Sequence, residues 1–188
     1  MSNRGASKHQ KTSGSPVSTA PASSSTTIEL IDVPAWERFA HSFAAALVKL
    51  AKDECLILSE TKHHRFVQFL DLGSEGMRAE AVSNDYLQKA DQLSRAAIDI
   101  LLAIGWDSPT HSADTEDGAE RPSSGSPNFH MHLGHPLPIA AIAVSAVQTL
   151  TYAFGARSLS ELRYRAFNTK NTADRVDFPA LGIRADEA

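Results

Sequence analysis

The sequence predicts an α+β fold: a two-layer sandwich in which an antiparallel sheet carries helices on one face. Apolar residues recur at three- and four-residue spacing in several segments, which is the period of amphipathic helices. Three consecutive short segments are rich in strand-favouring residues and are separated by turn signals. The 188 residues are 42% hydrophobic and 21% charged, which suits one ordinary core.

The folded domain is expected to begin at Ile28. Residues 1–27 are mainly Ser, Thr, Ala, Pro and Gly, with no apolar cluster that could offset the entropy of ordering them. We interpret 1–27 as a disordered leader and 28–188 as a single domain. Alternatively, the leader is phosphorylated or binds a partner, because many hydroxyls flank Lys8 and Lys11.

The first element of the domain is predicted to be a helix. Asp32 can cap its first turn, and Pro34 pre-sets φ without removing a needed donor. Six apolar residues then follow at helical spacing: Trp36, Phe39, Ala40, Phe43, Leu47 and Leu50. They form one stripe that must be buried against another layer.

The period then changes to that of strands. Three consecutive antiparallel strands are predicted over residues 55–60, 64–71 and 77–83.

The second of these strands is apolar on both faces, since successive side chains alternate. Helices are expected to cover one face. The other would remain partly exposed apolar surface, which is typical of an interaction site. The two sets are Phe66, Gln68 and Leu70 on one face and Val67, Phe69 and Asp71 on the other.

A second helix is predicted from the N-cap Asn84 to Gly105, with Trp106 packed back over its end. Residues 107–127 are rich in Asp, Ser, Gly and Pro, and we expect them to form a flexible loop. Residues 128–133 alternate in polarity and predict a fourth strand.

Two more helices complete the predicted order α-β-β-β-α-β-α-α. Pro138 opens an apolar segment that ends at Gly155; it is short for a membrane span and contains polar residues, so we expect a buried core helix. Ser158 and Glu161 form a capping box, which predicts a last short helix to about Phe167.

Composition excludes several classes of function. The formal net charge of −4 leaves no excess of basic side chains for nucleic-acid binding. No hydrophobic run near the start is typical of a signal peptide. The single cysteine, Cys55, lies in an apolar run and allows no disulfide framework, which suits a reducing compartment. We therefore expect a cytoplasmic protein with neither nucleic-acid nor membrane partners.

The usual signatures of catalysis do not occur. The sequence has no Gly-rich phosphate loop, nucleophile elbow, zinc-protease helix or C-x-x-C pair. Asp71 and Glu80 could form a carboxylate pair, but solvation at the surface is the favoured interpretation. Arg163 and Arg165 are interpreted as a solvated helix face. We expect neither an enzyme nor a cofactor.

Histidines offer one candidate metal site. His130 and His132 would share a strand face, and His135 follows at a spacing that metal sites use. The favoured interpretation is that two histidines simply face water on a half-buried strand.

Several dispersed segments resemble the signature of actinobacterial TY-Chap proteins, a family related to type III secretion chaperones and YbjN. They are FVQF at 66–69, AEAVSN at 79–84, LAIGW at 102–106 with Pro109, Asn128–Phe129, LRYRAF at 162–167 and Leu181–Gly182. The resemblance implies a secretion-chaperone-like sandwich that holds peptides or partner segments, in a family whose domains often dimerise.

The leading hypothesis is therefore a non-catalytic, chaperone-like module that binds a peptide or protein client by strand addition or in a hydrophobic groove. The candidate binding residues are Phe66, Gln68, Phe69, Glu80 and Trp106. The alternatives are a structural homodimer that pairs through the apolar helix at 139–154, without a client, and a histidine-based metal-binding protein.

Overall fold

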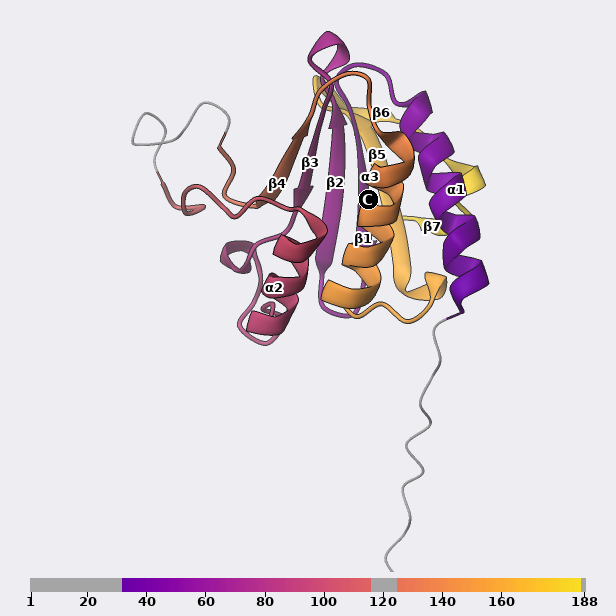
Figure 1. Cartoon of the computed structure of the whole chain (residues 1–188). Helices are drawn as coiled ribbons and strands as arrows, with labels where there is room; N and C mark the ends of the chain where they lie inside the picture. The colour runs from indigo at the N-terminus through magenta and orange to yellow at the C-terminus, as the bar shows by residue number, and fades with distance from the viewer. Residues whose placement is uncertain (1–31, 116–124, 187–188) are drawn as a thin grey trace, which may run out of the picture.

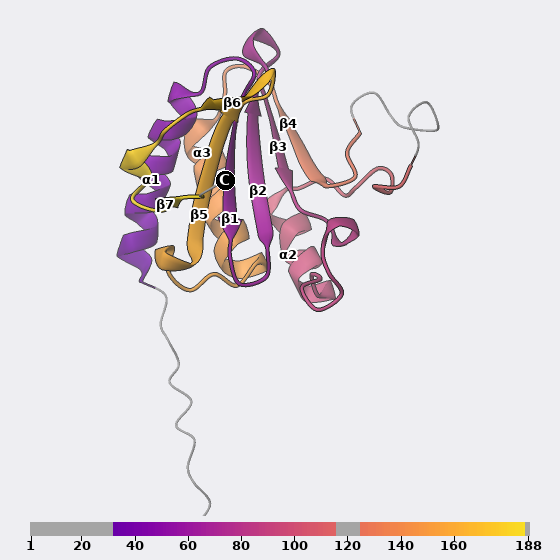
Figure 2. The same cartoon turned by 180° about the vertical axis from the view of Figure 1, so that it is seen from behind.

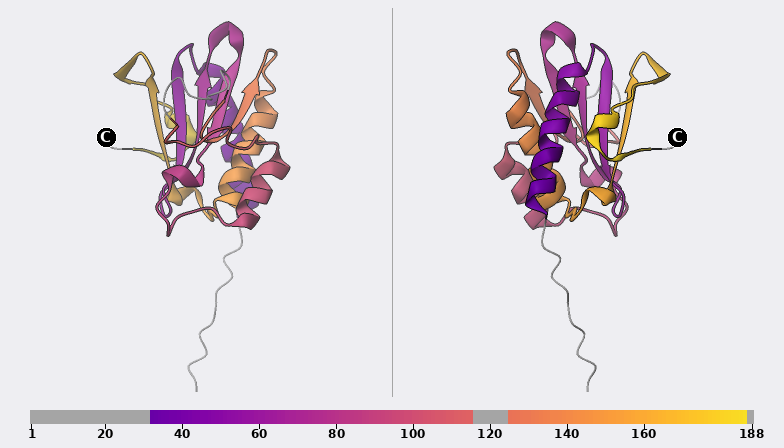
Figure 3. Two further views of the ribbon diagram at one scale, coloured as in Figure 1. Left: turned by 90° about the vertical axis from the view of Figure 1, so that its left-hand side faces the viewer. Right: turned by 90° about the vertical axis from the view of Figure 1, so that its right-hand side faces the viewer.

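The computed structural model describes residues 32–115 and 125–186, in which three α-helices pack against one face of a seven-stranded sheet (Figure 1). None of the three covers the opposite face (Figure 2), and edge-on views show the two layers (Figure 3). The predicted α+β sandwich with helices on one face is confirmed. Among the described helices, none is both long enough and apolar enough to cross a membrane.

The sheet order is β4-β3-β2-β1-β5-β6, and the short β7 pairs with β5 in parallel while every other pair is antiparallel. The helices are α1 (Val33–Lys49), α2 (Arg95–Ile104) and α3 (Ile139–Gln148), which continues as a π-helical turn over Thr149–Ala153. The strands are β1 (Glu54–Glu60), β2 (Arg65–Asp71), β3 (Met77–Ala81), β4 (Phe129–Leu133), β5 (Leu162–Asn168), β6 (Asn171–Arg175) and β7 (Arg184–Ala185).

Helix α1 forms as predicted. The Asp32 carboxylate caps it by accepting from the Ala35 N–H at 3.1 Å. Its apolar stripe is buried on the sheet, where the Phe43 ring meets Phe69 of β2 edge-on with centroids 5.1 Å apart. Each large side chain of this stripe contributes roughly 1.5–3 kcal/mol before entropy is counted.

The second helix is shorter than predicted, because it begins after Ser94 rather than at Asn84. The Ser94 hydroxyl accepts from the Ala97 N–H at 3.2 Å and caps the helix. The Asn84 side chain is occupied elsewhere: its Oδ1 accepts from the Leu93 N–H at 2.6 Å, and its Nδ2 donates to the Leu93 carbonyl at 3.1 Å. The Asn84 side chain therefore holds together the two ends of the irregular segment 84–93. Gly105 ends the helix as predicted, with φ of 111°.

The predicted last helix is wrong: the segment forms the inner strand β5. Strand β1 pairs with one edge of β5, and β6 and β7 each pair with the other edge. Residues of β5 alternate, with Leu162, Tyr164 and Ala166 buried and the intervening side chains on the other face. This two-residue period outweighs the capping signal, which produces only a 3₁₀ turn at Leu159–Glu161. After α3 and its π-helical turn, the chain therefore continues as strands and not as the predicted helix.

The stems of the predicted loop at 107–127 are ordered. Asp107 and His130 exchange two backbone hydrogen bonds, and the Thr110 N–H donates to the Ser126 carbonyl at 2.9 Å. The rest of that loop, 116–124, and the predicted leader at 1–27 lie outside the described residues.

Candidate functional site

The sheet face opposite the helices, called here the open face, is where the sequence places its interaction site (Figure 2). Register and alternation assign it thirteen side chains from five strands, most of them half-buried. They are Cys55, Ile57, Ser59, Phe66, Gln68, Leu70, Arg78, Glu80, His130, His132, Arg163, Arg165 and Phe167.

Three of the five predicted binding residues lie together on the open face. Phe66 and Gln68 are on β2, and Glu80 is the cross-strand partner of Gln68 on β3. The other two are core residues, with exposed fractions of 1% for Phe69 and 3% for Trp106. Phe69 faces the helix layer, and the ring of Trp106 is buried under the end of α2, so neither can touch a partner.

Glu80 is the centre of a polar network on this face. Its carboxylate accepts from Gln68 Nε2 at 2.7 Å, Arg78 Nε at 2.7 Å, Ser126 Oγ at 2.9 Å and Asn128 Nδ2 at 3.3 Å. Burial raises the pKa of Glu80, but the Ser126 bond, the Arg78 charge and the remaining bonds outweigh it and lower the pKa below its usual value. The network ties the chain before β4 to the sheet, so Glu80 is a structural anchor.

The predicted carboxylate pair does not form. Asp71 lies on the helix-facing side of β2, where its Oδ1 accepts from the Gly73 N–H at 2.6 Å. Glu80 lies on the opposite side of the sheet.

The three histidines do not converge. The rings of His130 and His132 are 5.7 Å apart at their centroids, whereas His135 bonds the Gly73 carbonyl at 2.9 Å, beyond the end of β4. Within residues 32–115 and 125–186, no three histidine, cysteine or carboxylate side chains are placed to hold one metal ion. The metal-binding alternative is therefore not supported.

Cys55 is a buried free thiol on β1, in agreement with its interpretation as a small hydrophobe. Burial raises its pKa to about 11, and the negative charge of Glu80 adds to the shift. A thiol of this kind is almost wholly protonated at neutral pH and is a poor nucleophile.

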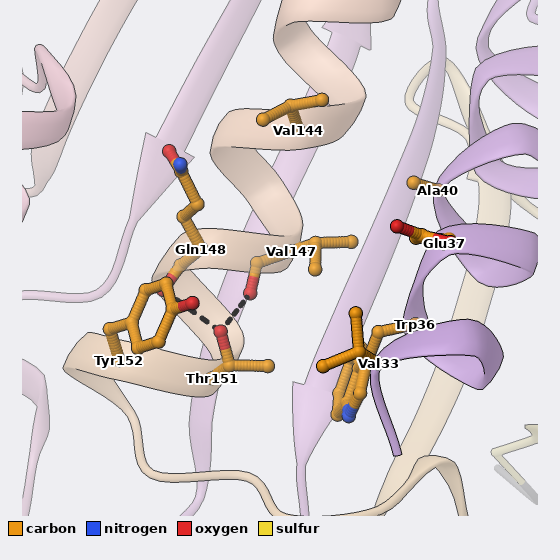
Figure 4. A pocket seen from close by; sticks show the side chains of 9 residues that line it. All are labelled: Val33, Trp36, Glu37, Ala40, Val144, Val147, Gln148, Thr151 and Tyr152. Carbon is orange, nitrogen blue, oxygen red and sulfur yellow. Dashed lines mark hydrogen bonds between the residues drawn. The ribbon is translucent and has the colours of Figure 1, made fainter. Parts of the chain in front are cut away.

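A concave surface lies in the helix layer, between α1 and α3. A hollow of about 190 Å³ forms where the start of α1 meets the end of α3 and the π-helical turn. Figure 4 shows Val147 pointing from α3 toward α1 and Tyr152 at the outer edge. Its walls are Val33, Trp36, Glu37, Ala40, Val144, Val147, Gln148, Thr151 and Tyr152.

A second hollow of about 420 Å³ continues the first along the same two helices. Small side chains from both helices line much of it, and it shares Glu37, Ala40 and Val144 with the first hollow. We call the two together the α1–α3 groove. The remaining lining residues are His41, Ala44, Ala140 and Ala143.

This groove exposes large apolar side chains to solvent. Val33 is 57% exposed, Val144 48% and Tyr152 63%. No charged residue occurs from Pro136 to Gly155, so the outer side of α3 lacks the charges that normally cover a surface helix. Sequence reasoning favoured a core helix for this segment, with a dimer interface as the alternative, and missed the groove; the uncharged run was the signal that could have revealed it.

Comparison with known families gives a match to the model of TY-Chap3, described as T3SS (YopN, CesT) and YbjN peptide-binding chaperone 3, over residues 31–168. The matched region runs from the start of α1 to the end of β5 and includes the groove and most of the open face. Searches of curated proteins and of solved structures found no significant match.

Proposed function

Since the chain belongs to the TY-Chap3 family of peptide-binding chaperones, we propose that it holds a helical segment of a partner protein in the α1–α3 groove, without catalysis. The family match confirms the resemblance to TY-Chap proteins that the sequence segments indicate. The groove gives that general role a surface of defined shape and chemistry.

The observation that carries the proposal is the combination of concavity and missing charge in the groove. An amphipathic helix binds such a groove through apolar side chains at positions i, i+3, i+4 and i+7. The small alanine side chains that line the groove, Ala44 and Ala140 among them, allow a backbone to approach closely, while Val33 and Val144 supply larger apolar side chains. Glu37 is a rim residue that can orient polar groups of the bound segment.

Two features of the open face favour a non-catalytic role. The Glu80 carboxylate is saturated by four side-chain donors, and the thiol of Cys55 has a pKa raised to about 11. Neither group is available as a base or nucleophile near neutral pH. A single buried free thiol also favours the reducing cytoplasm as the working compartment.

The exposed apolar face of α3 also favours a second candidate, in which another copy of the chain covers the groove. A self-complementary apolar patch is what a twofold dimer needs. In that case, a client segment would compete with dimer formation.

The test uses a labelled amphipathic helical peptide with leucines at i, i+3, i+4 and i+7, and a scrambled peptide of the same composition. Binding is followed by fluorescence anisotropy, and sedimentation reports the mass of the free protein. Val144→Glu places a charge in the groove, while Val48→Glu is the matched control, since Val48 is exposed on α1 outside both hollows.

We expect Val144→Glu to weaken binding of the amphipathic peptide by about tenfold or more, because the carboxylate must be desolvated. Val48→Glu should bind like the wild type. Equal binding by both variants, or equal binding of the scrambled peptide, contradicts the proposal. A wild-type dimer that Val144→Glu converts to a monomer, with no peptide bound by either form, would select the homodimer.

A further inference from the structure

We infer that the open face carries a second binding site, separate from the α1–α3 groove, for an extended acidic segment of a partner protein. Arg163 and Arg165 on β5 would bind its carboxylates. This inference does not depend on what occupies the groove.

The arginines are presented by strand alternation. Residues 162, 164 and 166 of β5 face the helices, so Arg163 and Arg165 project from the open face. Parallel register places Arg184 of β7 beside Arg163, and antiparallel register places Arg175 of β6 beside Phe167. Four arginines therefore lie on β5 or on the strands that pair with its outer edge, although the formal net charge of the protein is −4.

None of these four arginines forms an ion pair with another described residue. Arg163 Nη1 donates to the carbonyls of Ser160 at 3.0 Å and Leu162 at 2.7 Å, which fixes the guanidinium and leaves its other nitrogens available. Arg165 stacks over the Phe167 ring at 5.0 Å, an arrangement that keeps its N–H edge accessible.

Acidic side chains near β5 do not neutralise this cluster. Asp177 and Asp186 line a small hollow with Arg165 and Arg175 at the sheet edge, but no ion pair joins them in the described part of the chain. The open-face carboxylate, Glu80, is committed to Arg78 and to neutral donors, and it lies on β3, which β2 and β1 separate from β5. A positive surface whose arginines form no ion pair with the described residues is complementary to an acidic partner.

The spacing fits an extended chain. Side chains two residues apart on a strand repeat every ~6.6–6.8 Å, which is the spacing of Arg163 and Arg165 and also that of acids at i and i+2 in an extended peptide. Each arginine can hold a carboxylate bidentately. Ile57, the cross-strand neighbour of Arg165, gives the ion pairs an apolar flank that limits their screening by water.

A peptide fits these features better than a nucleic acid does. Tight nucleic-acid binding needs many neutralised phosphates and a basic domain, whereas this chain is acidic overall. The apolar side chains beside the arginines, Ile57 and Phe167 among them, suit a segment in which acidic and apolar residues alternate.

The probe is a labelled hexapeptide of alternating glutamate and valine, with control peptides that carry glutamine or lysine in place of glutamate. Anisotropy titrations at low and at roughly physiological salt are made on the wild type, Arg165→Gln and the double variant Arg163→Gln/Arg165→Gln. Arg95→Gln is the matched control, since Arg95 is exposed on α2 in the other layer. Arg165→Gln removes no backbone hydrogen bond, so it tests the site even if the double variant is unstable.

We expect the glutamate peptide to bind more tightly than both controls and to weaken as salt rises. Arg165→Gln should weaken it by about fivefold and the double variant by more than tenfold, with Arg95→Gln and Val144→Glu unchanged. Equal binding of the glutamine peptide, or wild-type affinity in Arg165→Gln, would overturn the inference. So would loss of binding in Val144→Glu, which would place the peptide in the groove, or tighter arginine-dependent binding of a single-stranded oligonucleotide.

Discussion

The indole N–H of Trp106 donates a 2.8 Å hydrogen bond to Oγ1 of Thr149, and both side chains are buried. The bond joins the residue that follows the Gly105 cap of α2 to the start of the π-helical turn after α3. It explains why Trp106 serves packing between the helices and not partner binding.

Thr149→Val should destabilise the fold by about 1–3 kcal/mol, because it keeps the shape of the side chain but leaves the buried indole N–H without an acceptor. Urea denaturation measures the change. Thr151→Val is the matched control: its hydroxyl only donates within the helix, to the carbonyls of Val147 at 2.7 Å and Gln148 at 3.4 Å, so its loss strands no donor. Equal costs for the two variants would mean that the Trp106 bond adds nothing specific.

Glu80→Gln should cost about 2–4 kcal/mol at neutral pH, because an amide nitrogen cannot accept from the donors that now surround the carboxylate. Since the folded-state pKa of Glu80 is lowered, its contribution is fully present above the unfolded pKa and is lost as pH falls through the folded value. The stability gap between wild type and Glu80→Gln should therefore shrink below about pH 4.

Urea denaturation of both proteins, at neutral pH and at successively lower pH, checks this expectation. Glu37→Gln provides the control, because Glu37 is exposed and makes no hydrogen bond among the described residues. A gap between wild type and Glu80→Gln that stays constant with pH would show that the carboxylate charge is not what the network recognises.

Periodicity in the sequence was sufficient to predict a helix or a strand where no other local signal pointed to a different structure. The stripe from Trp36 to Leu50 predicts α1, and the alternation around Val67 predicts β2, although not which of its two apolar faces meets the helices. Prediction failed where a local motif competed with tertiary pairing: the capping box at Ser158 suggested a helix, but three other strands provide ladder partners for β5. Asn84 was misread because an asparagine can bracket a loop as well as cap a helix.

The candidate surfaces were only half predictable. Residue alternation groups Phe66 with Gln68 and Leu70 on one face of β2, but the groove depends on how α1 and α3 pack, which no local pattern specifies. The arginines of β5 could not be assigned to a surface while their segment was interpreted as a helix.

Gly76→Ala should be far more destabilising than Gly155→Ala, although both glycines have left-handed φ values, of 98° and 82°. Any Cβ at a positive φ costs about 1–2 kcal/mol. At Gly76 that Cβ would also collide with the backbone carbonyl of Leu133, whereas at Gly155 no described atom outside its two chain neighbours lies within 4 Å of it. Thermal and urea unfolding of both variants compare them directly, and similar losses would mean that β4 moves aside easily.

The chain beyond Asn168 lies outside the family match, yet we expect the domain to need it. Strands β6 and β7 cover the free edge of β5, and the Phe178 N–H donates to Tyr164 Oη at 3.1 Å. Leu181 is buried against the core. Leu181→Ala should therefore cost about 2–5 kcal/mol, through lost burial and the cavity left behind.

Urea denaturation measures that cost, and Ile183→Ala, which truncates a less buried neighbour, should cost less. A chain ending at Asn168 should fold poorly or aggregate, because the edge of β5 would be open to other strands. If this truncated chain unfolds as cooperatively as the full one and Leu181→Ala is neutral, the C-terminal segment is only an attachment to a domain complete without it.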